Sequence, residues 1–389
     1  MRLLFLIYSL GSGGAERVTC HLANYWASQG HDVSIATLVG DEEPVYPIDP
    51  RVHLKSLDIA GPTRGIFVKV AKLFRRMRTI RRYLKQTKSD VVIGMMTETA
   101  VMLAIAAIGL KSRTMGAERS YAPLNPTPKM WSLLRKHCYR YLDVVIAQTA
   151  AMADWISAHT SARQIETIAN PIAELANLPP FINPADILSD RWNRKVIMNA
   201  GSLVPLKQHQ MLIEIFTEIA SEHPKWDLVI LGRGPLHEQL KAYTRSIGMA
   251  DRVQLPGRAG NMADWYDAAD IFALTSSFEG FPNVLLEAMS SGTACIAFDC
   301  LAGPSDLISD EVNGLLIDLN DRRAMSAALK TLMNDTALRK TFAEAAKKTA
   351  ENYEIEIIAA KWEKLFNPAR KLGSKPLGQF RSGKAGSSR

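Results

Sequence analysis

The sequence lacks the features that mark disulfide-bonded, metal-dependent and membrane-spanning proteins. Only four cysteines occur among its 389 residues, and no two of them form a C-x-x-C pair. This spacing argues against a secreted disulfide framework and against a cysteine zinc site. No Asp-x-Asp string is present either. We therefore expect a reducing compartment, no cofactor and no required metal.

Long apolar runs are also missing. The longest internal run, residues 100–110, is far shorter than the roughly 20 residues that a membrane-spanning helix needs. The apolar start, residues 3–8, leads directly into the turn Gly11-Ser12-Gly13-Gly14 with no A-x-A cleavage site. That pattern favours a buried first strand entering a glycine turn over a signal peptide. We expect a cytoplasmic chain that meets a membrane only from its inner face.

The net charge of +8 is unevenly distributed. Residues 1–180 carry 22 Lys and Arg against 14 Asp and Glu, residues 181–366 carry 19 against 25, and residues 367–389 carry 6 against none. An acidic second half is a poor fit to a general nucleic-acid binder, whereas a basic first half suits anionic lipid or a pyrophosphate. The basic tail 367–389 has almost no apolar residues, and we expect it to be disordered.

The length and the hydrophobic pattern predict two α/β domains. A chain of this length exceeds one ordinary core. Strand-like apolar runs alternate with amphipathic stretches in both halves, which is typical of parallel sheets with helical crossovers. The predicted strands are 3–8, 33–38, 91–95, 144–147, 196–199, 227–231, 271–275 and 294–298. A proline-containing stretch separates the halves, so we place domains at 1–175 and 194–352 with a linker at 176–193.

The most informative motif lies at residues 276–292, directly after a predicted strand. Pro282 suits a first helical turn, and Gly292 suits the position just past a helix end. We expect the helix to begin near Phe281, with its free N–H groups pointing at an anionic ligand. Glu279 would precede the helix and Glu287 would lie about two turns inside it. Either glutamate alone would be read as a turn or solvated residue, but together they place two acceptors for sugar hydroxyls beside one cleft.

The string E-G-F-P-N-V-L-L-E-A-M-S-S-G, with Glu279 and Glu287 spaced E-x7-E, resembles the donor site of the GT-B retaining glycosyltransferases of family 4. The resemblance extends to residues 11–16, 196–207 and 230–235, and to a helix at 354–366. It implies a GT-B fold, in which two Rossmann-like domains face each other across a cleft. It also implies that a C-terminal helix, placed at 353–366, returns to the first domain.

The resemblance also implies roles for individual residues. Glu279 would contact the transferred sugar as a catalytic residue, and Glu287 would hold the ribose. The adjoining loop would bind sugar and phosphate, and the first glycine turn would face the donor phosphates and the acceptor. These implied donor contacts are Gly280, Phe281, Pro282, Asn283, Gly13 and Gly14.

Two positions depart from the family pattern. The family places Arg and Lys on the donor diphosphate in a G-R-L-x-x-x-K stretch, and here Lys207 matches while the Arg position is Ser202. Either Lys207 supplies the charge alone or Arg233 or Arg258 contributes, and the sequence leaves this open. Arg119 stands where relatives often carry a His near the reacting sugar. Glu279, Lys207 and Arg119 are therefore the three catalytic candidates.

Residues 66–86 predict a basic amphipathic helix, because apolar residues recur at helical spacing and no acidic residue is present. The charged face is either simply solvated or a contact for anionic lipid and the pyrophosphate of a polyprenyl-linked acceptor. Its candidate contact residues are Lys69, Lys72, Arg75, Arg76, Arg78, Arg81 and Arg82. With the early S-G-G-A-E-R string, this helix resembles the bacterial enzymes that extend lipid-linked oligosaccharides and exopolysaccharides, including N-acetylgalactosaminyltransferases of protein N-glycosylation.

Three functions remain open at this stage. The favoured one is retaining transfer of a hexose or N-acetylhexosamine from a nucleotide sugar, UDP-linked by resemblance, to a polyprenyl-pyrophosphate-linked saccharide. An epimerase or phosphorylase would share the fold but would act on the free nucleotide sugar or on glucan. A non-catalytic nucleotide-sugar-binding relative is the third, to which the departures at Ser202 and Arg119 lend some weight.

Overall fold

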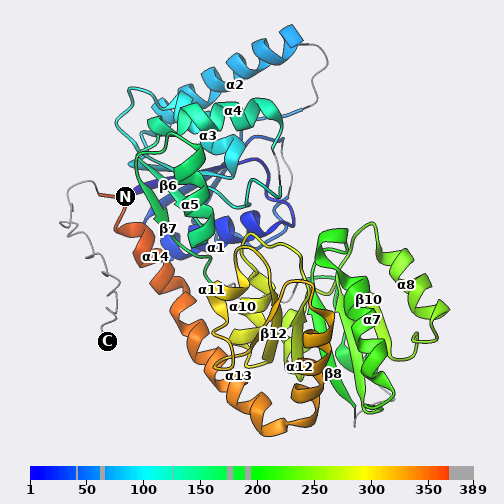
Figure 1. The fold of residues 1–389 in the computed structure, drawn as a ribbon. Coiled ribbons are helices and arrows are strands. Elements are labelled where there is room, and N and C mark those ends of the chain that lie inside the picture. Colours follow the sequence, from blue (N-terminus) through cyan, green and yellow to red (C-terminus); the bar gives the residue numbers. More distant parts are fainter. Residues whose placement is uncertain (41–42, 62–65, 126, 173–177, 189–193, 368–389) are drawn as a thin grey trace, which may run out of the picture.

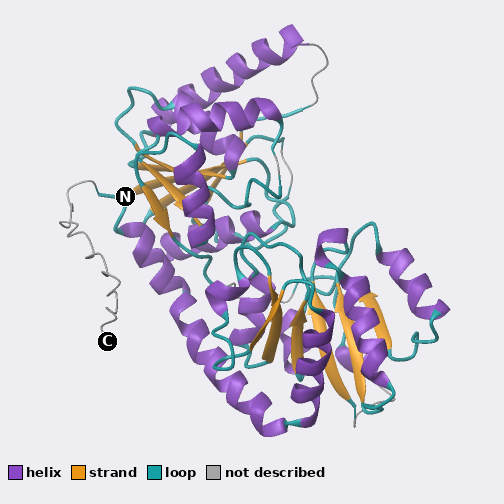
Figure 2. Ribbon diagram, viewed as in Figure 1, coloured by secondary structure: helices purple, strands orange, loops and turns teal. Residues whose placement is uncertain are grey.

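The structure is a computed structural model that describes residues 1–40, 43–61, 66–125, 127–172, 178–188 and 194–367, without the side chains of 66–72. Within these ranges the chain forms two α/β domains, each built around one parallel sheet (Figures 1 and 2). Apart from its first residue, the predicted disordered tail lies outside the described residues.

The N-terminal domain contains a seven-stranded sheet of order β3-β2-β1-β4-β5-β6-β7. Its central strands are buried on both faces, which is why they appear in the sequence as continuous apolar runs. The strand order reverses between β1 and β4, which are neighbours and pair in parallel. The strands are β1 (Arg2–Ile7), β2 (Asp32–Thr37), β3 (His53–Ser56), β4 (Val91–Met95), β5 (Arg113–Ala117), β6 (Val144–Ala147) and β7 (Ile165–Thr167).

The C-terminal domain repeats this plan with six strands, in the order β10-β9-β8-β11-β12-β13. Here the reversal falls between β8 and β11. Ligands of such sheets bind at the carboxyl ends of the strands beside this reversal. The strands are β8 (Lys195–Ala200), β9 (Trp226–Leu231), β10 (Val253–Gly257), β11 (Ile271–Leu274), β12 (Ala294–Asp299) and β13 (Leu315–Asp318).

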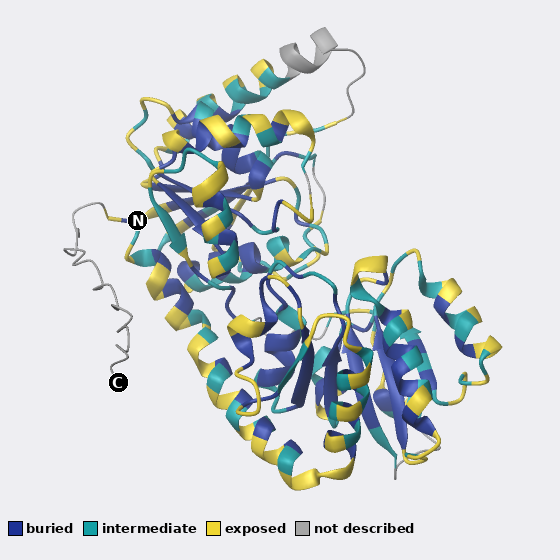
Figure 3. Ribbon diagram, in the orientation of Figure 1, coloured by how far each residue is buried: buried dark blue, intermediate teal, exposed yellow. Residues whose placement is uncertain are grey.

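Helices cover both faces of each sheet, and the buried residues form layers between helix and sheet (Figure 3). In the N-terminal domain, α1 (Gly14–Ser28) and α14 (Ile355–Glu363) cover one face. The other face carries α2 (Ile66–Thr87), α3 (Thr97–Ala106), α4 (Lys129–Cys138), the 3-10 helix η1 (Tyr139–Tyr141) and α5 (Ala150–His159).

In the C-terminal domain, α7, α8 and α12 pack on one face and α9, α10 and α11 on the other, while α13 contributes to both layers. These helices are α7 (His209–Ala220), α8 (His237–Ser246), α9 (Met262–Asp267), α10 (Asn283–Ser290), α11 (Pro304–Leu307), α12 (Arg322–Asn334) and α13 (Thr336–Ala350). The described residues also contain the short elements α6 (Pro184–Leu188), η3 (Pro205–Lys207) and η4 (Glu351–Tyr353).

The chain returns to the N-terminal domain at its C-terminal end, as the fold prediction required. Helix α14 lies against α1, where the rings of Trp362 and Phe366 pack edge-on to Trp26 at centroid distances of 6.3 and 5.2 Å. The indole N–H of Trp26 also donates to Glu363 at 2.9 Å. The N-terminal core therefore includes residues from both ends of the chain.

The donor-motif helix differs in detail from its prediction. It begins at Asn283 instead of near Phe281, and Pro282 is its N-cap residue. Glu287 therefore lies just over one turn into the helix, not two. Gly292 follows the C-cap residue with a φ of +76°, the left-handed conformation expected of a glycine at this position.

Candidate functional site

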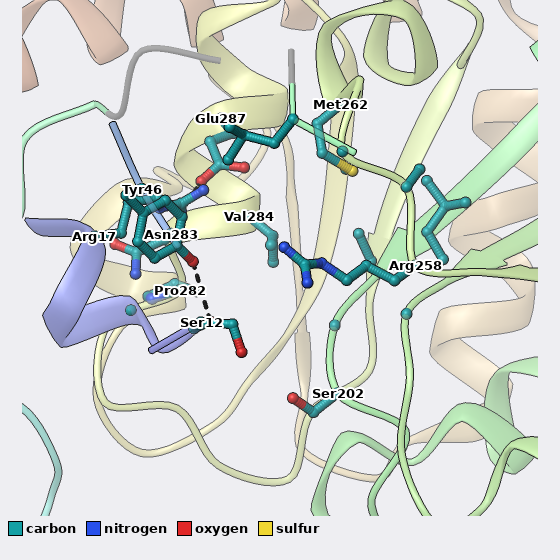
Figure 4. Close-up of a pocket in the computed structure, with 18 of the residues that line it drawn as sticks. Ser12, Arg17, Tyr46, Ser202, Arg258, Met262, Pro282, Asn283, Val284 and Glu287 are labelled. Carbon is teal, nitrogen blue, oxygen red and sulfur yellow. Dashed lines mark hydrogen bonds and ion pairs between the residues drawn. The ribbon is translucent and has the colours of Figure 1, made fainter. Parts of the chain in front are cut away.

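A cavity of about 510 Å³ lies between the two domains. Its walls come from the loops after β1, β8, β9, β10 and β11, so the carboxyl ends of both sheets meet there. Figure 4 shows side chains of both domains pointing into this space, with Arg17 and Tyr46 opposite Arg258 and Ser202. This is the position at which parallel α/β sheets bind ligands.

Glu279 is held at the cavity wall by two partners. Its Oε1 accepts from the Lys207 ammonium at 2.5 Å and from the Ser276 hydroxyl at 2.7 Å. The side chains are 9 % exposed for Glu279 and 18 % for Lys207, so the pair is largely shielded from water. A shielded charge pair fixes geometry more firmly than a surface pair does.

The Lys207 loop is attached to the strand that leads to Glu279. The Thr275 hydroxyl donates to the carbonyl of Lys207 at 3.2 Å, and the Ser277 N–H donates to the carbonyl of Leu206 at 2.8 Å. These bonds bring the loop after β8 against the loop after β11. The lysine and the glutamate are therefore positioned by backbone contacts as well as by their own charges.

Glu287 forms the second charge pair, and this pair crosses between the domains. Its Oε1 bonds the guanidinium of Arg17 on α1, and its Oε2 accepts from the Tyr266 hydroxyl at 3.0 Å. Burial opposes the charged form of Arg17, but the Glu287 carboxylate raises the pKa of Arg17 above its ordinary value. The pKa of Tyr266 is also raised, by burial and by Glu287.

Further cations line the same cavity. Arg233 follows β9 and Arg258 follows β10, and neither pairs with a carboxylate among the described residues. With Lys207 and Arg17 matched to Glu279 and Glu287, these two arginines leave the walls with an excess of positive charge. Ser202 also lines the cavity, at the position where the resemblance would place a cation.

Arg119, a predicted catalytic residue, does not line this cavity. Its Nη1 donates to Asn170 at 2.7 Å, its guanidinium stacks on Trp362 at 5.6 Å, and its Nε and Nη2 are buried. Burial lowers the pKa of Arg119 to about 10, which still leaves it charged at neutral pH. The Arg119 side chain is thus bonded within the N-terminal domain to Asn170, which itself reaches Asn283 of the other domain, and a role of Arg119 beside the reacting sugar stays a prediction.

The contact between the two domains is centred on Asn170. Its side chain also accepts from Gln148 at 2.8 Å and donates to Asn283 at 2.8 Å. A chain of buried hydrogen bonds thus runs from the N-terminal domain to the first residue of α10. Because unpaired polar groups are costly to bury, this chain fixes the start of α10 relative to the opposite domain.

The predicted glycines fall into two groups. Gly14 lines the cavity, and a Cβ atom there would lie 3.1 Å from Asn283 Nδ2, so the turn after β1 approaches α10 closely. Gly13 and Gly280 do not line it. Gly280 instead faces the carbonyl of Arg119, 3.2 Å from where a Cβ atom would be. The remaining predicted donor residues, Phe281, Pro282 and Asn283, all line the cavity.

The arginines of the basic helix α2 also fall into two groups. Arg75, Arg78 and Arg82 are exposed, in agreement with a face available to anions. Arg76 donates to the carbonyl of Ile59 at 2.8 Å, and Arg81 donates to carbonyls after α3 at 2.7 Å. These two arginines bind the helix to its own domain while staying partly exposed, so their contact with lipid stays a prediction. The side chains of Lys69 and Lys72 lie outside the described residues.

The most important residues that the sequence analysis missed are Arg17 and Tyr266. Arg17 sits inside the quoted S-G-G-A-E-R string, three residues after a glycine whose position at the cleft was predicted. Tyr266 lies on α9, more than 20 residues before Glu287, and no local pattern connects the two. Tyr46 was missed as well; its hydroxyl donates to the carbonyl of Ser12 at 3.0 Å and closes the cavity wall.

Over the described ranges, no group of three or more His, Cys, Asp or Glu side chains is placed to hold a metal ion. In the same part of the chain, no helix combines the length and apolarity needed to cross a membrane.

Two sequence families match the chain, one for each domain. Residues 12–174 match the family described as Glycosyltransferase Family 4, and residues 187–349 match the one described as Glycosyl transferases group 1. Together the matches span both walls of the cavity. The chain therefore belongs to the GT-B glycosyltransferases of family 4, and it is a glycosyltransferase.

Its relatives include enzymes of bacterial surface-glycan assembly. One, 28 % identical and aligned over 94 % of this chain and 98 % of its own, is the GalNAc-alpha-(1->4)-GalNAc-alpha-(1->3)-diNAcBac-PP-undecaprenol alpha-1,4-N-acetyl-D-galactosaminyltransferase of Campylobacter jejuni. Another is the amylovoran biosynthesis glycosyltransferase AmsD of Erwinia amylovora, 26 % identical over 94 % of this chain and 99 % of its own. Among solved structures, a sucrose-phosphate synthase from Thermosynechococcus elongatus superposes with a TM-score of 0.77 at 18 % identity, covering 94 % of this chain and 98 % of its own. That likeness confirms the GT-B fold.

Proposed function

We propose that the protein transfers a hexose or N-acetylhexosamine, with retention of anomeric configuration, from a UDP-linked donor to a polyprenyl-pyrophosphate-linked saccharide. The observation that carries this proposal is the pairing of Glu279 with Lys207 at 2.5 Å beside the start of α10. It puts a carboxylate for the sugar and a cation for the leaving diphosphate side by side.

The donor half of the proposal rests on the chemistry of the cavity. A nucleoside diphosphate brings negative charge to a wall that carries Lys207, Arg233 and Arg258 and that faces the positive end of α10. In the proposal, Glu287 accepts from the ribose hydroxyls and Glu279 accepts from the transferred sugar. Carboxylates suit both tasks, because each oxygen accepts more than one hydrogen bond.

The proposed reaction needs stabilisation of two developing charges. Positive charge grows at the anomeric carbon, near Glu279, and negative charge grows on the departing diphosphate, near Lys207 and the α10 N-terminus. The acceptor hydroxyl attacks from the face that the diphosphate leaves, and a diphosphate oxygen accepts its proton. The side-chain cations take the part that a divalent metal plays elsewhere, so we propose catalysis without one. Turnover that survives EDTA would agree with this, and turnover abolished by EDTA and restored by Mg²⁺ would refute it.

The acceptor half rests on relatives and on surface charge. The printed name of the Campylobacter jejuni relative describes an undecaprenol-diphosphate-linked acceptor, and AmsD belongs to exopolysaccharide synthesis. The exposed cations of α2 on the outer side of the N-terminal domain would bind the anionic headgroups of the membrane that carries such a substrate (Figure 1). We place the enzyme on the cytoplasmic face of that membrane.

The test is product analysis with a panel of UDP- and GDP-sugars, with and without polyprenyl-pyrophosphate-linked saccharides. We expect nucleoside diphosphate release to depend on one UDP-sugar and on the lipid-linked acceptor, and the new linkage to keep the donor's configuration. Conversion of a nucleotide sugar in the absence of any acceptor would instead support the epimerase alternative. Binding of a donor without any turnover would support the non-catalytic relative.

A further inference from the structure

The carboxylate assigned to the donor ribose, that of Glu287, already accepts a hydrogen bond at each of its two oxygens. Arg17 bonds Oε1 of Glu287, and Tyr266 donates to Oε2 at 3.0 Å. The Glu287 side chain is only 3 % exposed. Each oxygen keeps a second lone pair, but a side chain this enclosed is open to a ribose hydroxyl only if one of the groups that cover it moves.

The two donors differ in how easily they can leave. Tyr266 belongs to the same domain as Glu287, is fully enclosed by its core, and also donates to the carbonyl of Val284 at 3.2 Å. Arg17 belongs to the opposite domain, and its side chain is 23 % exposed toward the cavity. Arginine also has a long, flexible side chain with several donor groups. Arg17 is thus the partner that exchanges.

A displaced guanidinium needs a new anion, because a largely buried cation without one is costly. The donor supplies this anion within reach. Asn283, the first residue of α10, precedes Glu287 by four residues, which is roughly 6 Å along a helix. The first turn of α1 lies against this same end of α10, as the close approach of Gly14 to Asn283 shows. A modest rotation of the Arg17 side chain moves its charge from Glu287 to the N-terminus of α10.

We propose that Arg17 is a donor-binding residue supplied by the N-terminal domain: its side chain leaves Glu287, with which it is paired here, and moves onto the donor diphosphate when the ribose takes its place. This inference rests on the proposed function of the cavity. Arg17 would also supply the positive charge on the donor diphosphate that the resemblance places on an arginine at the position of Ser202.

The test compares UDP with uridine, because both carry the ribose and only UDP carries the diphosphate. Dissociation constants are measured by calorimetry on the full chain for wild type, Arg17→Gln and Arg17→Lys. In Arg17→Gln we expect UDP to bind about 10-fold more weakly, while uridine binds as tightly as to wild type or more tightly, since its competitor for Glu287 is gone. Arg17→Lys keeps the charge, and we expect it to retain UDP binding within about 3-fold.

The ratio of the UDP to the uridine dissociation constant tests whether Arg17 contacts the diphosphate. If Arg17→Gln changes UDP and uridine by the same factor in either direction, Arg17 is only a latch or only structural, and the inference is wrong. If that variant does not fold, Arg17→Met, which also removes the charge, is measured in its place with the same expected rise in the ratio of the UDP to the uridine dissociation constant. Wild-type protein that binds neither ligand would remove the proposed function itself, whereas normal wild-type binding with a constant ratio would remove only the role of Arg17.

Discussion

The two domains share one strand order, yet they contribute to the cavity in opposite ways. The C-terminal domain is acidic overall, but it places Lys207, Arg233 and Arg258 on the cavity wall. The N-terminal domain is basic overall, but it exposes much of that charge on α2, on the sheet face opposite α1, and brings Arg17 to the cleft. Net charge therefore says little about the site, and the position of each cation relative to the sheet edges says much more.

The largest expected effect is the loss of activity when a cation is removed from the C-terminal wall of the cavity. Replacing Lys207 by Met removes the cation beside Glu279, and we expect kcat/KM for the nucleotide sugar to fall about 10²–10³-fold, as for the loss of one preorganised donor to a developing charge. Steady-state nucleoside diphosphate release measures it. Lys225→Met, at an exposed position of the same domain, is the matched control and should retain activity. Equal activity in both variants would show that Lys207 does not stabilise the leaving group.

A second prediction concerns the contact that joins the domains. Asn170→Leu leaves the buried groups of Arg119, Gln148 and Asn283 without their shared partner. We expect the free energy of unfolding to drop by about 2–3 kcal/mol, because hydrogen bonds to charged groups are the strong ones. Denaturant unfolding measures it. Adding Arg119→Met should recover part of the loss, and a double variant that is less stable than the single would contradict this account of Arg119.

The third prediction tests the outer surface of the N-terminal domain. Neutralising Arg75, Arg78 and Arg82 to Gln should weaken binding to vesicles that contain anionic lipid by on the order of 100-fold, at about 1 kcal/mol per charge and with some loss to screening. Flotation or surface plasmon resonance measures it. The control replaces three exposed lysines of α13, Lys340, Lys347 and Lys348, by Gln. An equal loss in the control would mean that net charge, not α2, drives binding.

The smallest effect concerns pH and the C-terminal domain alone. His209 is buried next to Lys207, its Nε2–H donates to Asn199 at 3.0 Å, and burial together with Lys207 lowers its pKa from 6.5 to about 4. The unfolded chain thus binds more protons below pH 6.5, and stability falls as the pH drops from 6.5 toward 4. Between pH 7 and pH 5 we expect a loss of about 1–2 kcal/mol. Thermal unfolding measures it, and His209→Gln should show a flatter pH dependence between pH 7 and pH 5. An unchanged dependence in this variant would contradict the assignment to His209.

The same contrast between domains explains how far the sequence could be read. The continuous apolar runs of most central strands made both sheets predictable, because strands buried on both faces leave a strong signal. The central strand β5 (Arg113–Ala117) was missed, because Arg113, Thr114 and Gly116 interrupt its apolar residues. Edge strands such as β3 (His53–Ser56) were missed, since their exposed residues carry no such run. The strand β10 (Val253–Gly257) contains a proline and an irregular register, which hid it as well.

In the site, the residues that could be predicted are those that lie close together in the sequence. Glu279, Glu287 and the loop between them lie in one motif, so their meeting at one wall could be inferred from local spacing alone. The partners of these glutamates come from elsewhere: Arg17 from the other domain, and Tyr266 from another helix. Arg119 shows the reverse case: its place in the chain suggested the cleft, whereas its side chain lies outside the cavity lining and bonds Asn170 in its own domain.

The most direct test of the account is turnover by Glu279→Gln beside wild type, with the donor sugar and lipid-linked acceptor that the panel selects. Glutamine keeps the shape of the side chain and can still accept from Ser276, but it removes the charge that pairs with Lys207. The account predicts a folded variant that binds the donor within a few-fold of wild type and turns over at least about 10²-fold more slowly. Undiminished turnover by the folded variant would contradict the assignment of the reaction to this cavity.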